Sequence, residues 1–167
     1  MRKRNASRRR TLGTKTDSPA KQVAGFIAKF DPAAAKLIWS CRRVLRKRFP
    51  TAIELVYDNY NFFVIGYCAS ERPSDCIISL AAAANGVGLS FPYCGARLPD
   101  PHKILLGSGT QNRFIRLKSA ATLAEPAVEE MLQAAVGLAK TPLPASGRGC
   151  TIIQSVSAKQ RPRRRQS

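Results

Sequence analysis

The chain has 167 residues, of which 44% are hydrophobic, and a formal net charge of +18. This length favours a single domain, and no run of about 20 apolar residues is available to span a membrane. The amino-terminal segment lacks the apolar core of a secretory signal, so we expect a cytoplasmic protein whose five cysteines are reduced thiols. Because there is one histidine and no CxxC pair, we expect no cysteine–histidine metal site.

Most of the positive charge lies near the two ends of the chain. Residues 1–21 contain eight Lys or Arg and one Asp, and residues 140–167 contain seven Lys or Arg and no acid, whereas residues 22–139 are only slightly basic. Both ends are poor in large apolar residues, so we expect disordered basic arms on either side of an α+β domain at 22–139. The one apolar patch of the second arm, Thr151-Ile152-Ile153, could dock weakly on the domain. Such arms are either solubilising tails or sites of non-specific nucleic-acid contact through counterion release. The basic residues expected to make this contact are Arg2, Lys3, Arg4, Arg8, Arg9, Arg10, Arg161, Arg163, Arg164 and Arg165.

Two helices are expected at the start of the domain, over residues 22–30 and 32–48. Asp31 and Pro32 are suited to begin the second helix, as cap and as first helical residue. This helix has one apolar and one basic face, and Trp39 lies on the basic face. Trp39 could form a cation–π cluster with neighbouring arginines, but we expect it to pack beneath another segment.

The pattern then changes from helical periodicity to the alternation of strands. Tight turns such as Asn85-Gly86 favour antiparallel pairing, and in the fourth strand Gly86, Gly88 and Ser90 share a face that a ligand could approach closely. The expected order is ααβββββα, a mostly antiparallel sheet of about five strands covered by amino- and carboxy-terminal helices. The strands are expected at 52–57, 62–68, 76–82, 87–92 and 112–118, and the last helix at 125–138.

Three segments resemble a known family in their order and spacing. They read KLIWSCRRVLRKRFPTAIELVYDNYNFFVIGY, SLAAAANGVGLSFPYCGARLPDPHKILLGSG and RFIRLKSA. Together they are similar to the YdhG-like domain family of small, largely uncharacterised bacterial proteins, over residues 22–139. The resemblance implies an α+β fold in the cytoplasm and assigns no catalytic residues. Part of that family is described as frataxin-like, which implies iron delivery, but iron prefers clustered oxygen ligands and the acids of this domain are scattered.

Candidate binding residues are concentrated in the loop that precedes the fifth strand. His102 is the only side chain with an ordinary pKa near neutrality, and the glycines of Gly107-Ser108-Gly109 could present amides to an anion beside basic residues. A structural role for His102 and a plain loop are the alternatives, and the turn after the first strand could add polar groups. The candidate ligand-binding residues are Asp58, Asn59, Tyr60, His102, Lys103, Gly107, Gly109, Arg113 and Arg116.

No catalytic triad, carboxylate pair or complete phosphate-binding loop is recognisable in the sequence. We therefore expect a non-enzymatic binding module for a small anionic ligand or a protein partner, without a cofactor, whose basic tails contact nucleic acid. The alternatives are a metabolite enzyme that uses His102 and a frataxin-like iron chaperone. Oligomeric state and ligand identity do not follow from the sequence.

Overall fold

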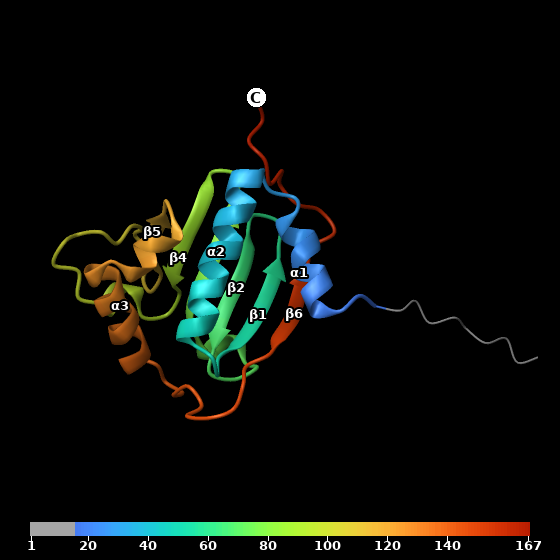
Figure 1. Cartoon of the computed structure of the whole chain (residues 1–167). Coiled ribbons are helices and arrows are strands. Elements are labelled where there is room, and N and C mark those ends of the chain that lie inside the picture. The colour runs from blue at the N-terminus through green and yellow to red at the C-terminus, as the bar shows by residue number, and fades with distance from the viewer. Residues whose placement is uncertain (1–15) are drawn as a thin grey trace, which may run out of the picture.

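The computed structural model describes residues 16–167 and confirms a mixed α+β fold, with helices packed against one sheet (Figure 1). Among these residues no helix is both long enough and apolar enough to cross a membrane. The helices are α1 (Pro19–Ile27), α2 (Pro32–Arg48) and α3 (Pro126–Gly137). The strands are β1 (Ile53–Asp58), β2 (Phe63–Cys68), β3 (Cys76–Ala83), β4 (Gly86–Phe91), β5 (Arg113–Leu117) and β6 (Thr151–Val156).

Helix α2 begins at Pro32, as the sequence predicts, whereas α1 begins at Pro19, three residues before the expected start at residue 22. The Asp31 side chain makes no capping hydrogen bond, which corrects the expectation that it caps α2. The Ser18 hydroxyl accepts a hydrogen bond from the Lys21 amide at the start of α1, and Pro19 and Pro32 each occupy a first helical position. In α2 the buried face includes Ile38 and Leu45. All three helices contribute apolar side chains to one core against the sheet.

The sheet has six strands in the order β5-β4-β3-β2-β1-β6. Neighbouring strands are antiparallel except β6, which runs parallel to β1. The expected count of five strands is corrected by β6, which lies in the segment expected to be a disordered arm, so the order is ααβββββαβ. Figure 1 shows β6 beside β1, on the other side of the molecule from α3, the helix that precedes it in the sequence.

A glycine and two isoleucines explain how the carboxy-terminal segment, residues 140–167, which we call the tail, joins the sheet. The Gly149 amide donates to the Pro50 carbonyl (2.9 Å), and a Cβ atom at this position would overlap the Ala52 carbonyl oxygen, so only glycine fits. Ile152 and Ile153 then pair with β1 and are half buried. The edge of β1 supplies the backbone partners that the tail sequence alone cannot provide.

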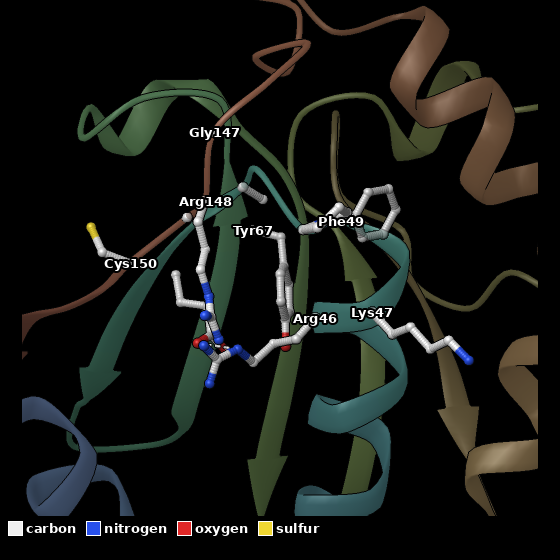
Figure 2. Close-up of a pocket in the computed structure, with 11 residues that line it drawn as sticks. Arg46, Lys47, Phe49, Tyr67, Gly147, Arg148 and Cys150 are labelled. Carbon is white, nitrogen blue, oxygen red and sulfur yellow. Dashed lines mark ion pairs between the residues drawn. The ribbon is translucent and has the colours of Figure 1, made fainter.

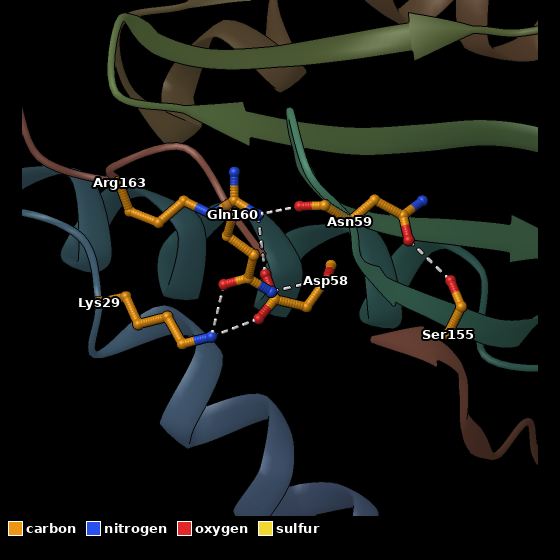
Figure 3. A network of polar contacts seen from close by, with 6 residues as sticks. All are labelled: Lys29, Asp58, Asn59, Ser155, Gln160 and Arg163. Atoms are coloured by element: carbon orange, nitrogen blue, oxygen red, sulfur yellow. Dashed lines mark hydrogen bonds and ion pairs between the residues drawn. The ribbon is translucent and has the colours of Figure 1, made fainter. Parts of the chain in front are cut away.

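The tail continues past β6 into a buried polar network (Figure 3). The Asp58 carboxylate, which is fully buried, accepts hydrogen bonds from Lys29 (2.6 Å) and from Arg163 (3.0 Å). Gln160 donates to the Asp58 carbonyl (2.8 Å), and its side-chain oxygen accepts from Lys29 (2.8 Å). Residues 151–163 are therefore a docked part of the fold, which corrects the expectation of disorder for them.

Trp39 also differs from the expectation. It is 37% exposed, and the Arg42 guanidinium carbon lies 5.6 Å from the centroid of its ring. The cation–π alternative is therefore the arrangement present, and Trp39 does not pack beneath another segment.

Candidate functional site

The two faces of the sheet differ in the size of their side chains. On the face turned to the helices, Val87, Leu89 and Phe91 are buried in the core. On the opposite face, β4 presents Gly86, Gly88 and Ser90, as the alternation in the sequence predicts. We call this second surface the open face, because the core formed with the helices lies on the other side.

A cavity of about 400 Å³ lies on the open face, and we call it the sheet-face cavity. Its floor consists of small side chains, its walls include two phenylalanines, and its only charged lining residue is Arg116. The guanidinium carbon of Arg116 is 5.6 Å from the centroid of the Phe114 ring, and a Cβ atom at Gly86 would come within 3.2 Å of Arg116 Nη1. The lining residues are Phe62, Val64, Ser79, Ala81, Asn85, Gly86, Gly88, Ser90, Pro92, Asn112, Phe114 and Arg116.

The predicted loop site is only partly assembled by the structure. Arg116 lies in the sheet-face cavity, but His102 and Lys103 are exposed and do not line it. Arg113 donates hydrogen bonds to the carbonyl groups of Gly109 and Asn112, so its guanidinium stabilises the turn before β5. The expected cluster of His102 with both arginines is therefore not present.

Asp100 and Gly107 determine the shape of the loop that precedes β5. The Asp100 carboxylate accepts hydrogen bonds from the Ile104 amide (2.9 Å) and the Leu105 amide (3.0 Å). Gly107 has a φ of 102°, which favours glycine, and it lies beside the Phe114 ring. A short 3₁₀ helix at Gly95–Arg97 precedes the loop.

Three further candidates, at the end of β1 and in the turn that follows it, have structural partners. Asp58 belongs to the buried network of Figure 3, and the Asn59 side-chain oxygen accepts a hydrogen bond from Ser155 (2.7 Å). Tyr60 is half exposed, with the Arg161 guanidinium carbon 5.7 Å from its ring centroid. None of the three lines the sheet-face cavity, so their polar atoms hold the tail rather than a ligand there.

A second cavity, of about 450 Å³, lies between the end of α2 and the chain entering β6 (Figure 2), and we call it the basic cavity. It is lined by Arg46, Lys47, Phe49, Pro50, Ala52, Glu54, Tyr67, Gly147, Arg148, Gly149 and Cys150. Its residues come from three separate stretches of the chain, 46–54, 67 and 147–150, so no local motif indicates it. The last of these stretches lies in the segment expected to be a disordered arm.

Three of the five cysteines are poorly suited to nucleophilic chemistry. Burial raises the pKa of Cys41 to about 11 and also raises the pKa of Cys94. Cys76 lies opposite Cys68 across β2 and β3, and their hydrogen bond together with burial raises the Cys76 pKa well above its ordinary value. These three thiols therefore stay protonated near neutral pH, where a thiolate would be the reactive form.

The described residues contain no group of three or more His, Cys, Asp or Glu side chains placed to hold a metal ion. Glu129, an acid of α3, forms an ion pair with Arg48. Glu129 therefore has a structural partner in α2.

Comparison with known proteins gives no family or relative. No family model matches the chain, and neither the search of curated proteins nor that of solved structures returned a match. The resemblance to the YdhG-like family remains a prediction.

Proposed function

We propose that this protein is a non-enzymatic binding module whose sheet-face cavity takes a small molecule with a flat apolar body and an anionic group. The observation that carries the proposal is the cavity of about 400 Å³ on the open face, with a small-residue floor and a single charge at Arg116. Pockets of this kind, mostly apolar with a few convergent polar groups, are the usual form of small-molecule sites.

The cavity favours a flat ligand because its floor has little side-chain volume. Ser79, Ala81 and Gly88 allow a ring to approach the strands closely, while Phe62 and Phe114 offer aromatic surface at the sides. No acidic residue lines the cavity, so the charge of Arg116 is available for a carboxylate, sulfonate or similar group.

The absence of a catalytic grouping around the cavity supports binding rather than turnover. Its two serines are Ser79 and Ser90, and the Ser90 hydroxyl donates to Asn112 (2.6 Å) rather than to a base. His102 does not line the cavity. An enzyme that uses His102 therefore has no support from this arrangement.

The basic ends add a second, weaker part to the proposal, which is non-specific contact with nucleic acid. Arg2, Lys3, Arg4, Arg8, Arg9 and Arg10 lie outside the described residues. Arg163 is buried against Asp58, so it is not open to a phosphate, whereas Arg161, Arg164 and Arg165 are exposed. Deletion of residues 1–15 should reduce salt-sensitive retention on DNA, and an unchanged salt slope would contradict this part.

The sheet-face proposal can be tested with anilinonaphthalenesulfonate, a flat aromatic anion whose fluorescence rises on binding. We expect saturable binding at one site by fluorescence and calorimetry. Ala81→Leu fills the cavity and should abolish binding, and Arg116→Gln should weaken it at least about tenfold, the value of one charge-assisted hydrogen bond.

Two matched controls separate the site from general surface effects. Ala33→Leu adds the same volume at an exposed position of α2, and Lys118→Gln removes the same charge beyond β5, yet neither residue lines the cavity. Both should keep the wild-type affinity. If Ala81→Leu binds the dye as well as Ala33→Leu does, the sheet-face cavity is not the site.

A further inference from the structure

The basic cavity has more positive charge than its own acid can balance. Glu54, which is buried, accepts two hydrogen bonds from Arg42, at 2.9 Å from Nε and 3.0 Å from Nη2. Arg46 reaches the same carboxylate only at 3.5 Å, and the Arg46 side chain is 44% exposed. The single Glu54 carboxylate therefore already pairs with two guanidinium groups, those of Arg42 and Arg46.

A third guanidinium, that of Arg148, enters the cavity from the tail. Figure 2 shows the Arg148 side chain extending toward Arg46, whereas Lys47 points away from both. No ion pair of Arg148 is found among residues 16–167. Guanidinium groups gathered in this way repel one another unless an anion lies between them.

Tyr67 supplies an independent sign of a missing partner. Its side chain is 1% exposed, and within the described part of the chain its hydroxyl has no partner in hydrogen-bond geometry. A buried hydroxyl without a partner costs free energy, so such groups are rare unless something satisfies them. Burial and the Glu54 carboxylate, which is close to the hydroxyl but outside hydrogen-bond geometry, raise the pKa of Tyr67 well above its ordinary value, so the hydroxyl keeps its proton and can donate.

Stabilisation of the carboxyl end of α2 explains only some of the basic residues of this cavity. Basic residues in the last turn of a helix stabilise its carbonyl end, and Arg46, Lys47 and Arg48 occupy that turn of α2. This effect does not require Arg148, which comes from a segment about one hundred residues later. It also leaves the Tyr67 hydroxyl without a partner.

We propose that the basic cavity binds the phosphate group of a small phosphorylated molecule, held by the guanidinium groups of Arg46 and Arg148 and by the Tyr67 hydroxyl. Arginine suits a phosphate because its planar fork donates two parallel hydrogen bonds. The volume of about 450 Å³ exceeds what a phosphate alone needs, and Phe49, Pro50 and Ala52 offer apolar surface to the rest of the ligand. This site does not depend on the sheet-face cavity.

Calorimetric titration of the full chain with inorganic phosphate and with phenyl phosphate tests the site. We expect one site per chain, with phenyl phosphate bound more tightly because of its apolar ring. Arg148→Gln should weaken both at least about tenfold. Arg43→Gln is the matched control, since Arg43 is an exposed arginine of α2 that does not line the cavity, and it should change the affinity less than about twofold.

Tyr67→Phe separates binding from folding. Removal of a hydroxyl that has no partner should leave the thermal midpoint unchanged or raise it, while phosphate affinity falls at least about fivefold. A lowered midpoint with unchanged phosphate affinity would show that the hydroxyl is structural and would overturn the proposal.

Two other outcomes would also overturn it. Equal losses in Arg148→Gln and Arg43→Gln would mean that phosphate responds only to net charge. Binding of a short oligothymidylate that depends on Arg148, without binding of inorganic phosphate or phenyl phosphate, would assign the cavity to a nucleic-acid backbone instead.

Discussion

The two cavities are built in different ways, although each borders the same sheet. The sheet-face cavity takes its residues from β2 to β5 and their connections, and these strands follow one another in sequence and pair antiparallel. The basic cavity joins the end of α2, the β1 and β2 strands, and the segment at 147–150. The first cavity therefore depends on local pairing, whereas the second exists only when the carboxy-terminal segment docks beside β1.

This difference predicts that substitutions in the buried polar groups around β1 affect stability far more than changes on the open face. The largest effect is expected for Arg42→Met, which leaves the buried Glu54 carboxylate without its bidentate partner. Loss of one partner of a buried ion pair costs about 3–5 kcal/mol. Urea denaturation measures this, with Arg43→Met as the exposed control, and a loss below about 1 kcal/mol would contradict a structural role for the pair.

Arg163→Met is expected to have a smaller effect. Asp58 would keep Lys29 but lose Arg163, so we expect a loss of about 1.5–3 kcal/mol, the range for a hydrogen bond to a charged group. Arg165→Met, in an exposed residue two positions later, should change the free energy of unfolding by less than about 0.5 kcal/mol. Equal stability of the two variants would show that the tail does not dock as described.

The smallest effect concerns Asp75, which ties residue 141 to the start of β3. Hydrogen bonds from the Ser70, Thr141 and Arg72 side chains lower the Asp75 pKa below its ordinary value of 3.8. A lowered pKa in the folded state contributes stability that is present above the unfolded-state pKa and is lost as the pH falls through the folded-state pKa. The free energy of unfolding should therefore fall less steeply below about pH 4 in Asp75→Asn than in the wild type.

A steeper or unchanged fall with Asp75→Asn would contradict the assignment of these hydrogen bonds. Glu71→Gln is the control, because Glu71 is an exposed carboxylate in the same turn and forms no ion pair among residues 16–167.

The sequence predicted the parts of the fold that depend on local patterns. The helical and alternating periodicities placed α1 to α3 and β1 to β5 within a few residues, and the Gly/Ser face of β4 does line a cavity. The prediction missed β6 because its two isoleucines lie between prolines and arginines, and their burial depends on the edge of a strand about one hundred residues away.

The candidate residues show the same limit. Asp58 and Arg163 were assigned to different functions, a ligand site and a nucleic-acid tail, but the fold pairs them with each other. Tyr67 and Arg148 carried no signal because neither the burial of a hydroxyl nor the meeting of distant arginines is visible in a linear pattern. Contacts between distant segments, rather than residue types, decide which charges remain open to a ligand.

The central claim is that the two faces of the sheet hold separate ligand sites, and amide chemical-shift mapping tests it most directly. Phenyl phosphate should shift residues around Arg46, Tyr67 and Arg148, and anilinonaphthalenesulfonate should shift β3, β4 and β5. Arg148→Gln should abolish only the first set of shifts, and Ala81→Leu only the second. If both ligands shift the same residues, or if one substitution abolishes both sets, the claim of two separate sites is wrong.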